Sequence, residues 1–161
     1  MINIINIIAI IISPIVAVVV GQYLQNQSKK RNEKMEIFKL LMFSRGLGWS
    51  IERVRALNII EIVFSEDKEV LAQWKVYYDK LNVDDPSETD LLKMKTEENK
   101  LLEVMAKSLG YKDKITWETI QKPYIPQGLI NSIEQQERFQ TAQLDFANFA
   151  SSFIQQMGDK K

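Results

Sequence analysis

The chain has 161 residues, enough for one domain of ordinary size or one domain with an appended segment. It contains 21 basic and 21 acidic side chains, but no histidine and no cysteine. This composition excludes thiol nucleophiles, disulfides, zinc fingers and proton transfer by histidine. The net charge of zero argues against a dedicated nucleic-acid-binding protein, which normally carries an excess of basic residues, so we expect no nucleic-acid partner.

The first 28 residues carry no charged side chain, and fourteen of the eighteen residues from Ile4 to Gly21 are Ile, Val or Ala. A helix of this length can cross a hydrocarbon core of about 30 Å, and a single segment can cross lipid only as a helix. We therefore predict a transmembrane anchor over residues 1–28 and a helical domain over residues 29–161. A signal peptide and a buried core segment are the alternatives. The uncharged start and the length of the apolar run favour the anchor.

Basic residues follow the apolar segment closely, and none precedes it. The positive-inside rule then predicts a protein of the cell inner membrane, with its N-terminus outside and its C-terminal domain in the cytoplasm. The same residues are candidates for contact with anionic lipid headgroups, which makes the bilayer an expected partner. They are Lys29, Lys30, Arg31 and Lys34. A topology signal without specific lipid contact is the favoured interpretation of these charges.

The rest of the sequence predicts helices separated by short polar or glycine-containing segments. The predicted helices cover residues 30–43, 50–64, 65–81, 85–109 and 129–157, and a short helix at 116–121 is an alternative to a loop. Ser50 and Ser65 are expected N-caps, and the glycines at positions 46, 48 and 110 are expected to end helices. We therefore predict an all-α protein with one N-terminal transmembrane helix followed by a cytoplasmic bundle of four or five helices.

The last predicted helix carries phenylalanine and alanine at alternating spacings of three and four residues, from Phe139 to Phe153. This spacing is typical both of a helix that packs into a bundle and of a seam between associated helices. Few charged residues flank the stripe, so little would specify a partner helix. Packing within the body is the favoured interpretation.

Residues 56–64 are apolar on every side except at Asn58 and Glu61. An all-round apolar helix is normally buried, and residues three apart share a face. A buried carboxylate needs a cationic or hydrogen-bonding partner. The candidate cations nearby are Arg45, Arg53 and Arg55. We predict a buried polar cluster of Arg45, Asn58 and Glu61, which either fixes helix packing or binds a ligand, with the packing role favoured.

No pattern of catalytic residues stands out. Neither of the glycine-rich phosphate-binding motifs occurs, and the acidic segment 82–90 does not have the ligand spacing of a calcium loop. We therefore predict no enzymatic activity, no catalytic residue, no metal and no cofactor. Tyr124, which Pro123 and Pro126 flank, is a candidate recognition residue, and a ring that clamps its loop onto the body is the equal alternative.

Several short motifs follow the apolar segment in a fixed order: IFKLLMFSR, RALNIIEIVF, W-x-x-Y-Y, MAKSLGY and Y-x-P-Q-G. Over about residues 5–140 the chain resembles a family of small single-pass bacterial membrane proteins that is catalogued only as a domain of unknown function. The resemblance implies a bacterial origin and a single-span topology, and it brings no activity or cofactor. Recurring positions of that family correspond to Arg45, Asn58, Trp74, Tyr78 and Tyr124. The three aromatic residues are candidates for recognition of a partner.

These observations predict a membrane-anchored interaction or accessory protein without catalytic apparatus, which binds a protein partner or further copies of itself. One alternative is a ligand-responsive membrane sensor or effector that uses a polar cluster around Asn58 and Glu61. The other is a small membrane-active toxin or pore-forming oligomer.

Overall fold

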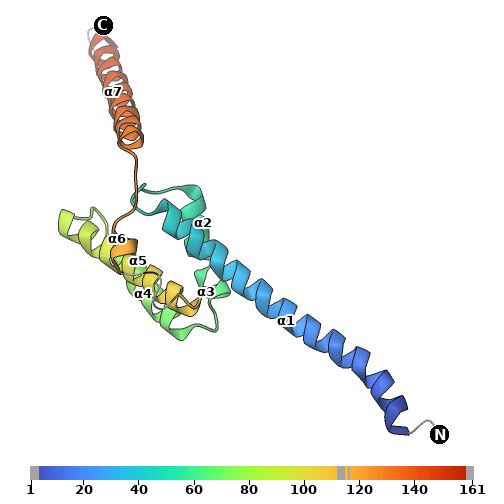
Figure 1. Ribbon diagram of the computed structural model, residues 1–161. Coiled ribbons are helices and arrows are strands. Elements are labelled where there is room, and N and C mark those ends of the chain that lie inside the picture. Colours follow the sequence, from blue (N-terminus) through green and yellow to red (C-terminus); the bar gives the residue numbers. More distant parts are fainter. Residues whose placement is uncertain (1–3, 112–114, 116, 159–161) are drawn as a thin grey trace. The chain divides into compact units, whose positions relative to one another are not determined.

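The computed structural model describes residues 4–111, 115 and 117–158, and for residues 4–11, 153, 154 and 156–158 only the backbone. These described residues form seven α-helices and no strand, so the all-α prediction is confirmed (Figure 1). The chain divides into two compact units, Met1–Pro123 and Tyr124–Lys161.

Helix α1, Ile4–Ser44, runs without interruption for 41 residues and contains Pro14. The sequence predicts that a separate helix begins near residue 30. No such break occurs, because residues 24–34 contain neither glycine nor proline to stop the helix. No helix among the described residues is long and apolar enough to cross a membrane. The side chains of residues 1–11, the first part of the predicted anchor, lie outside the described residues.

A glycine-containing turn separates α1 from the next helices. Gly46 and Gly48 have φ angles of 77° and 82°, a left-handed conformation that glycine adopts without strain, as the sequence predicts. Helix α2, Ile51–Asn58, begins at the predicted cap, where the Ser50 hydroxyl accepts a hydrogen bond from the Arg53 amide at 3.2 Å. The predicted single helix over 50–64 is broken at Ile59, and a one-turn helix α3, Ile60–Val63, follows.

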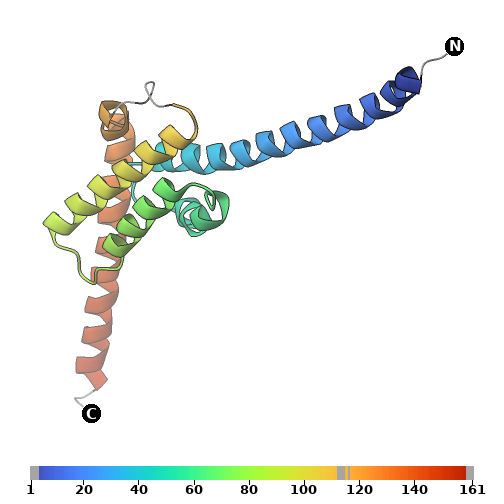
Figure 2. The ribbon, with the colours of Figure 1, turned by 90° about the horizontal axis from the view of Figure 1, so that it is seen from below.

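Helices α4, Lys68–Leu81, and α5, Glu88–Ser108, lie side by side (Figures 1 and 2). The N-cap of α4 is Asp67 and not the predicted Ser65. The sequence predicts that α5 starts at residue 85. Its N-cap is instead Ser87, two residues later, and the Ser87 side chain forms a reciprocal capping box with Asp90. Gly110, with a φ of 88°, follows the end of α5 as predicted.

The short helix α6, Trp117–Gln121, occurs where the sequence predicts a short helix as an alternative to a loop. Helix α7, Gln127–Gly158, is the last helix of the described residues. Six helices therefore follow α1, and the prediction of four or five is wrong. Relative to the five predicted helices, the predicted helix over 30–43 is part of α1, and the break at Ile59 and α6 add two. Both are single-turn features that hydrophobic periodicity does not resolve.

The core of the first unit gathers apolar residues from the carboxyl-terminal part of α1 and from α2 to α6. Phe38 and Leu41 of α1, Leu102 and Met105 of α5 and Ile120 of α6 are all buried. Each buried side chain of this size contributes about 1.5–3 kcal/mol relative to exposure. This packing holds α1 against the rest of its unit from Ile37 onwards, whereas the described residues 12–33 of α1 are exposed.

Candidate functional site

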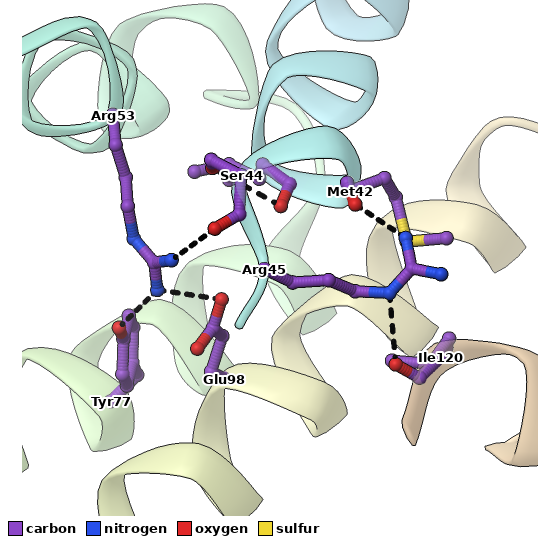
Figure 3. Close-up of polar contacts among 8 residues, drawn as sticks. Met42, Ser44, Arg45, Arg53, Tyr77, Glu98 and Ile120 are labelled. Carbon is purple, nitrogen blue, oxygen red and sulfur yellow. Dashed lines mark hydrogen bonds and ion pairs between the residues drawn. The ribbon is translucent and has the colours of Figure 1, made fainter. Parts of the chain in front are cut away.

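A buried arginine lies at the centre of the first unit. Arg53 of α2 is 5% exposed and pairs with Glu98 of α5, with 2.6 Å between Nη2 and Oε1. Its Nη2 also donates to the Tyr77 hydroxyl at 3.4 Å, and its Nη1 donates to the Ser44 carbonyl at 3.2 Å. Figure 3 shows these three partners around the guanidinium. Arg53 thus connects α1, α2, α4 and α5.

The electrostatics of this cluster reflect burial and pairing together. Burial alone would lower the pKa of Arg53, but the charge of Glu98 and the contact with Tyr77 outweigh it and raise that pKa. Burial also raises the pKa of Tyr77. Among the described residues, two buried side-chain atoms have no hydrogen-bond partner, Arg53 Nε and Glu98 Oε1, although Oε1 forms the ion pair with Arg53 Nη2. A buried N–H donor such as Arg53 Nε normally has a hydrogen-bond partner.

Sequence spacing places both charges on apolar helix faces. Arg53 precedes Ala56, Leu57 and Ile60 by three, four and seven residues, and all three are buried. Glu98 precedes Leu101, Leu102 and Met105 by the same intervals, and these too are buried. The ion pair between Arg53 and Glu98 was not predicted from the sequence. A charge that interrupts an otherwise apolar face of each helix was the signal that could have revealed it.

A cleft of about 210 Å³ opens beside the cluster. One wall is a face of α5, where residues 91, 94, 95, 98 and 99 recur at helical spacing. Trp49 also lines the cleft, and its ring centroid lies 5.0 Å from the Arg53 guanidinium carbon. The described residues contain no cluster of three or more acidic side chains that could hold a metal ion.

Arg45 also lines this cleft, but its guanidinium reaches away from Arg53 (Figure 3). Its Nε and Nη2 donate to the carbonyls of Ile120 and Thr119, each at 3.0 Å, and Nη1 donates to the Met42 carbonyl. Burial lowers the pKa of Arg45. Arg45 therefore joins the end of α1 to α6, and none of the ion pairs formed by the described residues includes it.

The structure does not form the predicted buried cluster of Arg45, Asn58 and Glu61. Asn58 and Glu61 are both exposed. The break at Ile59 ends the predicted continuous helix between them, and Ile62 beside Glu61 is 73% exposed. The buried polar cluster is instead the one around Arg53, which was only one of three candidate arginines.

The predicted recognition aromatics differ in their surroundings. Trp74 is buried, and its ring packs against that of Tyr78 with centroids 5.6 Å apart, while Tyr78 itself is half exposed. Both line a second cleft of about 670 Å³ together with Glu61. Tyr124 belongs to the other unit and is 90% exposed. A role of these residues in recognition stays a prediction.

Three of the four basic residues predicted to contact lipid headgroups also contact the body of the protein. Lys30 pairs with Glu66 at 2.6 Å, and Lys34 pairs with Asp67 at 2.5 Å. Arg31 Nη2 donates to the Leu109 carbonyl at 3.3 Å. The fourth, Lys29, is exposed. These contacts fix α1 beside the start of α4 and the end of α5, and headgroup contact stays a prediction.

The second unit exposes the phenylalanine stripe of α7. Phe139, Phe146 and Phe149 are between 63% and 72% exposed, and Ala142 between them is exposed as well. Phe153, the last member of the predicted stripe, lies outside the residues whose side chains are described. Packing of this stripe against the body stays a prediction.

The comparisons with known proteins identify a family and no function. A model described as "Family of unknown function (DUF6680)" matches residues 1–160, nearly the whole chain. No curated protein and no solved structure matches the chain. The family match confirms the part of the sequence-based resemblance that concerned a domain of unknown function.

Proposed function

Because the chain belongs to this family of unknown function, DUF6680, we propose a function from the surfaces of the chain itself. It is a non-catalytic interaction protein that associates with further copies of itself through α7. Its apolar N-terminal segment holds it at a membrane. The single observation that carries the proposal is the exposed phenylalanine stripe of α7.

Exposure of several neighbouring phenylalanine side chains to water is unfavourable in free energy. Burial of a phenylalanine contributes about 1.5–3 kcal/mol, and contiguous exposed apolar patches typically mark interaction sites. The intervals between Phe139, Ala142, Phe146 and Phe149 are three, four and three residues, the spacing at which helices associate in a coiled-coil seam. Self-association of α7 would bury all of these side chains.

The charge distribution favours a second copy as the occupant. From Phe139 to Met157, the only charged residue is Asp145. Two such helices meet with almost no like-charge repulsion, and a strongly charged partner would find no complementary charges beside the stripe.

Support for the membrane part of the proposal comes from the sequence. The segment from Ile4 to Gly21 is uncharged and mostly Ile, Val and Ala, and basic residues follow it within a few positions. The proposed location is the cell inner membrane, with the N-terminus outside and the remaining chain in the cytoplasm.

The test of self-association compares two double variants of the full-length protein. Phe146→Glu/Phe149→Glu places two charges in the stripe. Asn148→Glu/Ser151→Glu adds the same two charges on the opposite side of α7, where both residues are exposed. Analytical ultracentrifugation in mild detergent should show an oligomer for the wild type and the Asn148/Ser151 variant, and a monomer for the Phe146/Phe149 variant. A monomeric wild type, or equal behaviour of the two variants, would contradict the proposal.

The membrane anchor is tested separately. A charged residue in the middle of a spanning helix costs about 2.5–3.5 kcal/mol on insertion scales. Val16→Lys/Val19→Lys should therefore release the protein from membranes in a flotation assay, whereas Gln25→Lys, beyond the apolar segment, should not. Wild-type protein that is extracted completely by alkaline carbonate would refute the anchor and leave self-association through α7 unaffected.

A further inference from the structure

The Arg53 cleft has features that neither the packing of the unit nor self-association through α7 uses. Arg53 itself is nine-tenths buried, and its Nε–H has no hydrogen-bond partner. Asn99, which is also buried, lines the same cleft, and its carboxamide can both donate and accept hydrogen bonds. Buried donors and acceptors in proteins are almost always paired, with protein, water or ligand. A cleft lined by these two polar side chains is equipped for a polar ligand.

The charges of the lining favour an anion. Three cationic side chains, Arg45, Arg53 and Lys95, line the cleft, and Glu98 is the only acidic side chain among its lining residues. Glu98 is paired with Arg53, so the cationic excess is not compensated within the cleft. Lys95 is exposed at the mouth, one turn of α5 before Asn99, where it can meet an anionic group as it enters.

The remaining lining favours a flat apolar body on the ligand. Trp49, Leu91 and Met94 line the cleft, and Trp49 offers an open aromatic face because it is 61% exposed. A volume of about 210 Å³ equals that of roughly seven water molecules. That volume suits one ring with one anionic group, and excludes a dinucleotide or a folded peptide.

We propose that this cleft binds a small molecule in which a carboxylate or phosphate group is attached to a single apolar ring or short apolar chain. The anionic group lies between Lys95 and Asn99 beside the Arg53 guanidinium, and the apolar part lies against Trp49 and Met94. The site lies within the first unit and does not depend on the proposed role of α7.

The experiment uses the full-length protein and three probes of similar size, benzoate, phenyl phosphate and benzyl alcohol. A fourth, larger probe is a short-chain phosphatidic acid kept below its aggregation concentration. Isothermal titration calorimetry measures the affinity for each probe. Quenching of tryptophan fluorescence by the probe reports contact with Trp49 if the Trp49→Phe variant no longer shows that quenching. We expect saturable binding of at least one anionic probe, about tenfold tighter than that of benzyl alcohol. The aromatic probes and the phosphatidic acid distinguish a soluble anion from a lipid headgroup.

Two variants connect binding to the named side chains. Lys95→Gln should weaken the affinity for the tightest-binding anionic probe about fivefold, the equivalent of about 1 kcal/mol. Lys93→Gln, on the same helix but outside the cleft lining, should leave that affinity unchanged. Arg53→Met/Glu98→Met replaces the buried ion pair by apolar side chains, a change that proteins often tolerate. This variant should fold, as shown by an unchanged circular dichroism spectrum, and should lose anion binding.

Three results would overturn the proposal: no saturable binding of any anionic probe, equal affinity for benzyl alcohol, or unchanged anion binding in the folded Arg53→Met/Glu98→Met variant. None of these results bears on the oligomeric state of α7, so failure here and failure of the proposed function are distinguishable.

Discussion

The two units of the chain use the same apolar spacing in different ways. In α4 and α5, the residues at helical spacing are covered, and Tyr77 and Leu102 are almost completely buried. In α7, Phe146 at the same kind of spacing is 72% exposed. Helices α4 and α5 are joined by residues 82–87, a connection short enough to bring them together as neighbours. The comparison shows that periodicity identifies an apolar face, and that a short connection such as residues 82–87 brings a neighbouring helix to cover it.

The largest expected effect concerns the polar centre of the first unit. Arg53→Gln leaves Glu98 without its ion-pair partner, and removal of one member of a buried pair typically costs about 3–5 kcal/mol. Urea unfolding, followed by circular dichroism, should show a loss of this size. If the loss were below about 1 kcal/mol, the pair would not be a structural element of this unit. Arg55→Gln, an exposed arginine two residues along, is the control.

A matched pair of truncations tests the contrast between covered and uncovered apolar residues. Leu102→Ala removes a fully buried side chain and should destabilise the first unit by about 2–5 kcal/mol. Phe149→Ala removes a larger but exposed side chain and should leave the unfolding of the first unit within about 0.5 kcal/mol of the wild type. Similar losses for both variants would mean that α7 packs on the first unit.

A pH-dependent effect is expected where α1 meets α4. Burial alone would raise the pKa of Asp67, but hydrogen bonds from Lys34 and from Ser108, at 2.5 and 2.6 Å, outweigh it and hold that pKa below its ordinary value of about 3.9. A group with a depressed pKa stabilises the fold above its unfolded-state pKa, and this stability is lost as the pH falls through the folded-state value.

Asp67→Asn should therefore cost no more than about 1 kcal/mol near pH 6, given the partial exposure of the pair, and close to nothing near pH 2. Unfolding of wild type and variant across this pH range measures the difference. A constant difference at all pH values would show that the carboxylate charge is not what matters. Asp79→Asn, with an exposed carboxylate on α4, is the control.

The smallest effect is expected for Lys30→Gln. Its ion pair with Glu66 is more than half exposed on both sides, and such pairs contribute little because water and salt screen them. Thermal unfolding should not distinguish this variant from Lys29→Gln. A clear loss for Lys30→Gln alone would mean that the contact of α1 with the body depends on this pair.

Local signals in the sequence predicted much of the fold, and pairings between distant residues account for most of what they missed. Ser50 and Gly110 act as predicted, because a cap or a left-handed turn depends only on the residues beside it. The break at Ile59 has no such signal, since no glycine or proline marks it. For the candidate site, three arginines preceded Glu61 within sixteen residues, but the partner that matters, Glu98, follows Arg53 by 45 residues. Only the folded arrangement of α2 and α5 selects it.

The dependence of α1 on later segments has a consequence during synthesis. The ring of Phe38 stacks on that of Tyr111, with centroids 6.4 Å apart, and Tyr111 follows Phe38 by 73 residues. At a translation rate of about 5–20 residues per second, Phe38 leaves the ribosome roughly 4–15 s before the residue that covers it leaves. During that interval the apolar side of α1 is available to chaperones and to lipid. The order in which the chain is made therefore leaves the carboxyl-terminal part of α1 uncovered until the helices that enclose it have been synthesised.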